Sequence, residues 1–178
     1  MTSYRRSRVA GATYFFTVNL ARRSQSLLVE HIASLRAAFK YVRIRHSFTV
    51  DAIVILPDHL HAVWTLPPDD DDFAVRWRLI KTAFSRGLLR NEHRSVSRHT
   101  KRERGIWQRR YWEHLVRDEG DLSRHVDYIH MNPVKHGLVA RLADWPHSSF
   151  HRYVRTGALP MDWAGDMALE ENGYGERE

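Results

Sequence analysis

Two histidines in an apolar segment, His59 and His61, are spaced so that they could share a metal ion. They follow Pro57 and Asp58, a turn signal, and residues 59–66 (HLHAVWTL) are typical of a β-strand. Residues i and i+2 of a strand point to one face, so the two imidazoles would lie together while Leu60 turns into the core. Imidazole nitrogen binds divalent metals, although two hydrogen-bonded surface histidines would have the same spacing.

A second polar set lies along a helix that we predict over residues 120–132. Its polar residues repeat at i, i+4, i+7 and i+11: Asp121, His125, Tyr128 and Asn132. Its apolar residues, which predict the core face, are Leu122, Val126 and Ile129. This pattern leaves the Tyr128 hydroxyl off the core, where it could act as a nucleophile, although a half-buried tyrosine at a helix edge has the same spacing. The Asn132-Pro133 step predicts that the helix ends there.

The positive charge is the third feature that could carry function. The chain has 178 residues, a formal net charge of +7 and a sequence pI near 10.0. Of its 28 basic residues 24 are arginine, whose planar fork fits phosphate, and aromatic residues make up 11%. This combination is typical of single-stranded nucleic-acid binding, although a solvated basic surface also gives it. The candidate DNA-binding residues are Tyr4, Arg5, Arg6, Arg8, Trp77, Lys81, Arg109, Arg110 and Lys135.

The charge is unevenly distributed along the chain. Residues 86–110 hold nine basic residues against two acidic ones and predict a polar basic loop, whereas residues 162–178 carry a net charge of −5. The acidic segment could pack against the active site or could be an unattached solubilising tail. We therefore expect one domain over residues 1–161 and an acidic C-terminal tail over residues 162–178.

Hydrophobic patterning predicts how these features are positioned. Strands are expected over residues 13–20, 48–56, 59–66 and 111–117, and helices over residues 26–40, 73–89 and 120–132. The order β-α-β-β-α-β-α predicts an α+β fold, a ferredoxin-like split βαβ sandwich with an antiparallel sheet. The last helix in this order, which bears Tyr128, is an addition to the ferredoxin-like fold. Residues 140–178 are expected to form an irregular C-terminal extension.

Several classes of protein are excluded by composition. The chain has no cysteine, which excludes a thiolate zinc site, an iron–sulfur cluster and a cysteine nucleophile. No apolar run approaches the roughly 20 residues that span a bilayer. The basic N-terminus is not followed by the apolar stretch of a secretory signal. We expect a cytoplasmic protein with no membrane partner.

Two of these segments resemble a known family. Residues 56–64 (LPDHLHAVW) resemble the His-hydrophobic-His signature of the HUH single-tyrosine transposases, and residues 127–137 (DYIHMNPVKHG) resemble their tyrosine helix. More narrowly, the chain is similar to the REP-associated tyrosine transposases of bacteria. Further stretches that match this branch are residues 4–6, 17–20, 70–73, 106–108 and 162–166.

The resemblance implies a reaction and a role for each residue. His59 and His61 would hold a divalent metal, Mg²⁺ or Mn²⁺, with Asn132 completing the ligand set. Tyr128, activated by the metal or by a base such as His125 or His130, would attack DNA and form a 5′-phosphotyrosine bond. The implied partner is single-stranded DNA with a REP-type hairpin, bound by a nucleoid-associated protein. The branch is expected to act as a monomer, whereas the wider class often dimerises.

Two other classes of function stay open at this point. A non-catalytic, structured nucleic-acid-binding protein would use the same basic and aromatic residues, with His59 and His61 only structural. A metal-dependent phosphodiesterase would use water as its nucleophile and would not need Tyr128. The first predicts DNA binding without a covalent product, and the second predicts cleavage that survives the loss of the Tyr128 hydroxyl.

Overall fold

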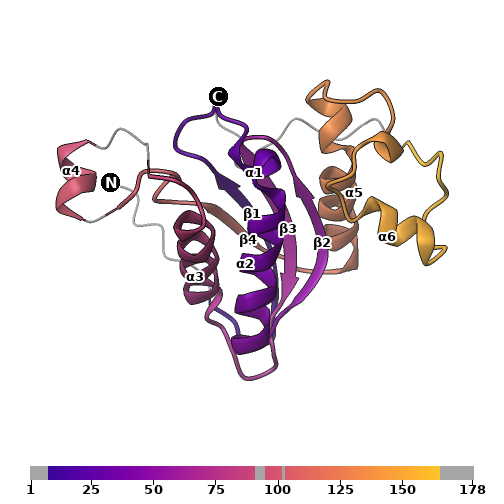
Figure 1. The fold of residues 1–178 in the computed structure, drawn as a ribbon. Helices are drawn as coiled ribbons and strands as arrows, with labels where there is room; N and C mark the ends of the chain where they lie inside the picture. Colours follow the sequence, from indigo (N-terminus) through magenta and orange to yellow (C-terminus); the bar gives the residue numbers. More distant parts are fainter. Residues whose placement is uncertain (1–7, 91–94, 102, 165–178) are drawn as a thin grey trace, which may run out of the picture.

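A four-stranded antiparallel sheet forms the centre of the molecule (Figure 1). The computed structural model describes residues 8–90, 95–101 and 103–164. The strands are β1 (Thr13–Asn19), β2 (Thr49–Ile55), β3 (His59–Thr65) and β4 (Trp112–Leu115), in the spatial order β2-β3-β1-β4. This is the arrangement of a split βαβ fold, because β3 lies between β1 and β2.

Helices cover both faces of this sheet. They are α1 (Leu27–Glu30), α2 (Ile32–Arg45), α3 (Phe73–Arg86), α4 (Val96–Thr100), α5 (Glu119–Lys135), η1 (Leu142–Asp144) and α6 (Phe150–Arg155). Figure 1 shows α2 and α3 side by side on one face, while α5 packs on the other face against β2 and β3. The predicted α+β class, with an extra helix that bears Tyr128, is confirmed. The helix predicted over residues 26–40 is wrong in detail, since a turn at His31 divides it and α2 continues to Arg45.

Alternation along β3 assigns its side chains to the two faces. Leu60 and Trp64 pack in the core under α2 and α3, where Trp64 stacks on Trp77 with ring centroids 4.1 Å apart. Val63 packs in the smaller cluster under α5. His59 and His61 share the face of Val63, because residues two apart in a strand point the same way. The prediction that Leu60 turns into the core is therefore confirmed.

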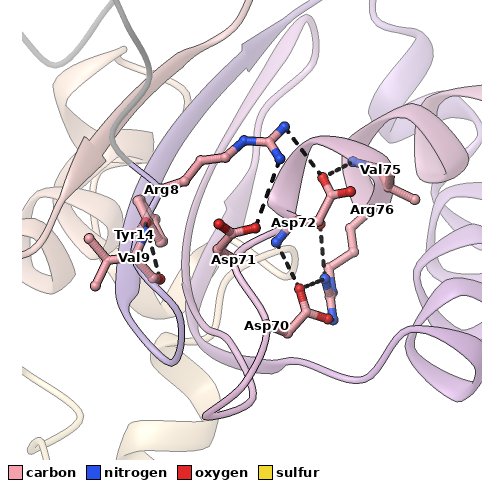
Figure 2. A network of polar contacts seen from close by, with 8 residues as sticks. All are labelled: Arg8, Val9, Tyr14, Asp70, Asp71, Asp72, Val75 and Arg76. Carbon is pink, nitrogen blue, oxygen red and sulfur yellow. Dashed lines mark hydrogen bonds and ion pairs between the residues drawn. The ribbon is translucent and has the colours of Figure 1, made fainter.

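An acidic loop before α3 organises the entry to that helix (Figure 2). The buried Arg76 guanidinium donates to both carboxylate oxygens of Asp70, at 3.0 and 2.7 Å, and holds the pKa of that carboxyl below its ordinary value. Asp72 caps the helix by accepting a hydrogen bond from its third backbone amide. Arg8 forms ion pairs of 3.8 Å with Asp71 and Asp72, so the loop also anchors the first described residue of the chain.

The C-terminal region is more regular than the sequence predicts. The irregular extension expected over residues 140–178 contains η1 and α6, and it borders the edge strand β2. The Ile55 amide donates to the His147 carbonyl at 2.9 Å, and the Ser149 amide donates to the Ile53 carbonyl at 2.8 Å. Trp163 packs against the same region. The domain boundary expected between residues 161 and 162 stays a prediction. Residues 165–178 of the predicted tail lie outside the described residues.

The segment after α3 also differs from expectation. It contains the short helix α4 where a basic loop was predicted, and α3 ends at Arg86 rather than at residue 89. The Arg104 guanidinium donates to the carbonyls of Ser85, Leu88 and Leu89, so it joins this segment to the last turn of α3 and to the residues that follow it. None of the helices within the described residues combines the length and apolar character that crossing a membrane requires.

Candidate active site

The histidine pair lies at the start of β3, directly after the turn at Pro57. The His59 and His61 side chains are 2% and 0% exposed, and their ring centroids are 5.0 Å apart. Two buried imidazoles side by side on one strand face confirm the arrangement that the spacing predicts. They do not pack as surface residues, so the surface-histidine interpretation is wrong.

Each imidazole is oriented by a protein oxygen at its Nδ1 atom. The His61 Nδ1 lies 2.8 Å from the Thr17 hydroxyl on β1, and the His59 Nδ1 lies 2.7 Å from an Asp58 carboxylate oxygen. Asp58 also pairs with the Arg23 guanidinium. Burial alone would raise the pKa of Asp58, but its contacts with His59 and Arg23 outweigh burial and lower it. With both Nδ1 atoms engaged, Nε2 is the nitrogen that each ring would offer to a metal.

Tyr128 reaches this pair from α5, on the same face of the sheet. Its ring centroid lies 5.2 Å from that of His61 and 6.0 Å from that of Phe15. Helix α5 begins with the Asp118 side chain accepting from the Asp121 amide at 2.8 Å, and Ile129 packs against the sheet. The structure thus joins residues that lie almost seventy positions apart in the sequence.

The polar stripe of α5 is buried, which corrects the prediction that it faces away from the core. Tyr128 is 2% exposed and Asn132 is 0% exposed. The reason is that α5 packs on a sheet face that carries polar residues, so both the apolar and the polar stripe contact the sheet. Asn132 lies one turn beyond Tyr128, on the helix that packs over the histidine pair.

The predicted end of this helix is wrong. Helix α5 continues through Pro133 to Lys135, and the His136 amide donates to the Asn132 carbonyl at 3.0 Å. Proline removes one backbone donor, but the turns that follow it keep their hydrogen bonds. The longer helix brings two cationic or titratable residues to the site. The Lys135 Nζ lies 3.3 Å from the Tyr128 hydroxyl, and the His136 ring centroid lies 5.1 Å from that of His59.

The donor set fits a divalent metal. His59, His61 and Asn132 offer two imidazole nitrogens and an amide oxygen, a combination that suits Mn²⁺ and also Mg²⁺ on a phosphate. Both imidazoles carry the oxygen contact at Nδ1 that is typical of metal-ligating histidines. Sequence reasoning missed Thr17 and Asp58, which make these contacts, because neither is a ligand itself.

A second cluster was also missed. Within residues 8–90, 95–101 and 103–164, one set of three side chains, His114, Asp121 and His125, has ligand atoms within 4.8 Å of one another. Its atoms are engaged in hydrogen bonds: the His114 Nε2 lies 2.8 Å from the Asp121 carboxylate, and the His125 Nδ1 donates to the Asp121 carbonyl at 2.7 Å. Burial opposes ionisation of Asp121, but its contacts with His114 and the Arg117 amide lower its pKa.

The two histidines considered as bases for Tyr128 differ in position. Burial holds the pKa of His125 below its ordinary value, and its ring packs 4.7 Å from Phe15, which also contacts Tyr128. His130 faces α6 instead, where its Nε2 lies 3.0 Å from the Ser149 hydroxyl. Burial lowers the pKa of His130 to about 4, so it is neutral at pH 7. His130 therefore packs against the start of α6.

The candidate DNA-binding residues do not form one cluster. A groove of about 630 Å³ lies between α3 and the segment that leads to β4. Its basic side chains are Arg78, Lys81, Arg86, Arg90, Arg104 and Arg109. Lys81 donates to the Gln108 carbonyl at 3.1 Å, and Trp77 is only 1% exposed, so its ring is part of the core and does not reach a base.

The remaining candidates lie elsewhere. Arg109 pairs with Glu103 at 2.8 Å beside the groove, and Arg110 is exposed. Lys135 lies beside Tyr128, and Arg8 forms an ion pair with Asp71 of the acidic loop before α3. Tyr4, Arg5 and Arg6 lie outside the described residues.

The groove and the histidine pair are connected through the end of β1. The Gln108 amide donates to the Asn19 carbonyl at 3.0 Å, and Asn19 is the register partner of His59. The Leu20 amide donates to the Asp58 carbonyl at 2.8 Å. The basic segment therefore passes next to the strand end that holds the histidines.

Proteins of one bacterial family are similar to this chain over nearly its whole length. No family model matches the sequence. A protein of Escherichia coli (strain K12) named REP-associated tyrosine transposase is 46% identical over 168 residues, covering 94% of this chain and 93% of that protein. A Haemophilus influenzae protein of the same family name is 46% identical over 174 residues, covering 97% of this chain and 99% of that protein. A solved structure of the REP-associated tyrosine transposase bound to a REP hairpin matches with a TM-score of 0.86 and 45% identity, over 100% of this chain and 99% of that one.

Proposed function

The chain belongs to the REP-associated tyrosine transposases, and from this premise we propose that it cleaves and rejoins single-stranded DNA beside REP-type hairpins through a covalent bond to Tyr128. The observation that carries the proposal is the approach of Tyr128 to the histidine pair, with its ring 5.2 Å from that of His61. Near-full-length identity to proteins named tyrosine transposases supports it.

Tyr128 is the nucleophile of the proposed reaction. Its phenolic oxygen attacks the phosphorus of a phosphodiester in line, and a new O–P bond forms as the bond from phosphorus to the 3′ oxygen breaks. The phenolic proton passes to the departing oxygen or to solvent. The products are a 5′-phosphotyrosine bond and a free 3′-hydroxyl. Because one phosphodiester replaces another, attack by a 3′-hydroxyl can reverse the step and rejoin a strand.

His59, His61 and Asn132 would hold a divalent cation, Mg²⁺ or Mn²⁺. When bound, it would neutralise charge on the scissile phosphate. Neighbouring residues of the protein orient these ligands. Thr17 and Asp58 engage the Nδ1 atoms, at 2.8 and 2.7 Å, which turns each Nε2 toward the ligand position.

The DNA would follow the basic groove toward the histidine pair. The arginines of α3 and of the following segment suit hairpin phosphates, and the connection of Gln108 to Asn19 leads from the groove to His59. The Tyr128 side chain is 2% exposed, so the scissile phosphate must come to it. We infer that the DNA next to Tyr128 is unpaired, because a single strand exposes its backbone phosphates more fully than a duplex does. A relative of known structure is bound to a REP hairpin, which supports this class of partner.

The proposed cycle can run in a single subunit. With one nucleophilic tyrosine, full strand transfer needs either two subunits or successive reactions at one site. We favour a monomer that acts on the nucleoid in the bacterial cytoplasm. Size-exclusion chromatography with light scattering, with and without a REP hairpin, tests this: a dimer in both states contradicts it.

The function is tested on a denaturing gel with a fluorescent REP hairpin that carries single-stranded flanks. The reactions contain Mn²⁺, Mg²⁺ or EDTA, and compare the wild type, Tyr128→Phe and the matched control Tyr41→Phe on the exposed surface of α2. We expect a metal-dependent, SDS-stable protein–DNA band for the wild type and Tyr41→Phe, and none for Tyr128→Phe.

Two outcomes contradict the proposal. Cleavage that persists in Tyr128→Phe indicates a phosphodiesterase that uses water. Hairpin binding without cleavage in any metal, over a panel of REP hairpins that relatives do cleave, indicates a non-catalytic nucleic-acid-binding protein.

A further inference from the structure

Lys135 contacts the atom that is proposed to react. Its Nζ lies 3.3 Å from the Tyr128 hydroxyl oxygen and 4.8 Å from the centroid of the ring. The two residues are seven positions apart on α5, about two helical turns, so they share one face of the helix. This contact exists because α5 continues through Pro133. Tyr128 is 2% exposed whereas Lys135 is exposed, so the ammonium meets the hydroxyl at the solvent side of the site.

We propose that Lys135 is a catalytic residue that acts on the Tyr128 oxygen, and not a general contact to DNA phosphates. The inference rests on the proposed function. During cleavage, the ammonium donates a hydrogen bond to the phenolic oxygen and directs its lone pair at the phosphorus. This contact fixes the nucleophile before DNA binds, so its orientation is not lost to side-chain motion.

During rejoining, the same contact stabilises the leaving group. A 3′-hydroxyl attacks phosphorus, its O–P bond forms, and the bond from phosphorus to the Tyr128 oxygen breaks. The phenolic oxygen departs with the bonding electron pair, and the proton of the attacking hydroxyl restores the phenol directly or through solvent. A fixed ammonium at 3.3 Å lowers the energy of the charge that develops on this oxygen.

The test separates catalysis from DNA binding. It compares Lys135→Met, Lys135→Arg and Lys40→Met, a matched control at an exposed lysine on α2. The readouts are the hairpin dissociation constant by fluorescence anisotropy and the single-turnover rate of covalent adduct formation at saturating hairpin. We expect Lys135→Met to lower the rate about 10- to 100-fold with affinity nearly unchanged, and Lys135→Arg to recover part of it. Weaker affinity with a normal rate at saturation would overturn the inference.

A modified substrate identifies the oxygen on which Lys135 acts. A hairpin with a sulfur in place of the bridging 3′ oxygen at the cleavage site has a leaving group that departs without protonation. If Lys135 acts on the Tyr128 oxygen, the Lys135→Met defect persists with this substrate. If the defect disappears, Lys135 assists the 3′ oxygen instead and the inference is wrong.

The rejoining step gives a second, independent measurement. Isolated adduct is mixed with a strand that ends in a 3′-hydroxyl, and the disappearance of the SDS-stable band is followed. Lys135→Met adduct is expected to rejoin about 10- to 100-fold more slowly than wild type, and an equal rate contradicts the role in rejoining. A wild type that forms no adduct overturns the proposed function itself, whereas a wild-type adduct with an unaffected Lys135→Met overturns only this inference.

Discussion

The Nδ1 atom of His61 lies 2.8 Å from the hydroxyl of Thr17, and the two residues are direct register partners across β1 and β3. Both side chains are fully buried. A cross-strand partner therefore engages one nitrogen of His61 and leaves Nε2 as the nitrogen that the ring would offer to a metal. At His59, the carboxylate of the preceding residue, Asp58, makes the corresponding contact with Nδ1.

Thr17→Val is expected to weaken metal binding while the fold is kept. Valine has the shape of threonine but cannot accept or donate a hydrogen bond, so the His61 ring is no longer oriented. Removing such a partner typically lowers metal affinity about 10- to 100-fold. Calorimetric titration of Mn²⁺ into the DNA-free protein measures the effect, with the exposed Thr49→Val as control. Equal affinity in both variants would falsify the orienting role of Thr17.

Removing single arginines from the groove is expected to lower the salt dependence of hairpin binding. Arg78, Arg86 and Arg90 are exposed and line the groove beside α3. For each arginine that binds a phosphate, the change to glutamine should lower the slope of log K against log salt by about 0.7–0.9. Anisotropy titrations between low and moderate salt measure the slope. Arg155→Gln on α6 is the control, and a slope that changes as much in this control would refute the assignment.

Trp77→Phe is expected to change stability and not DNA affinity. The Trp77 ring is 1% exposed and stacks on Trp64, so a smaller ring leaves a cavity in the core. The expected decrease is about 1–2 kcal/mol in the free energy of unfolding, measured by urea denaturation. Hairpin affinity measured without denaturant should match the wild type. If Trp77→Phe instead lowers hairpin affinity as strongly as the loss of a ring that stacks on a base, then Trp77 contacts DNA and the prediction is wrong.

Acid is expected to destabilise the protein through His130. Burial lowers the pKa of His130 to about 4 in the fold, against 6.5 for the ordinary side chain. Between these values the unfolded chain binds a proton that the fold does not, so stability is complete above about pH 6.5 and falls toward pH 4. The decrease by this route approaches about 3 kcal/mol at the lower end.

His130→Gln should remove this part of the pH dependence, because glutamine can still hydrogen-bond to Ser149 but does not titrate. Urea denaturation at pH 7, 6, 5 and 4.5 measures it, with exposed His99→Gln as the control. The expected result is a flatter curve for His130→Gln alone. Parallel curves for the wild type and both variants would show that His130 does not contribute.

Much of the fold follows from local patterns in the sequence. The alternation of His59, Leu60 and His61 assigns one strand face to chemistry and the other to the core, because period two is a property of the strand itself. Asp72 caps α3 through contacts within one helical turn. The order of strands and helices permits few topologies, and the split βαβ sheet is among them.

Other features depended on interactions between distant segments. The sequence alone indicates which residues can do chemistry, namely His59, His61 and Tyr128, since their types and spacing are local. Only the tertiary structure decided that Thr17 orients one imidazole, that the polar stripe of α5 is buried, and that Lys135 reaches Tyr128. The physical reason is that α5 packs along a sheet and against η1 and α6, and this packing outweighs the single backbone donor that is missing at Pro133.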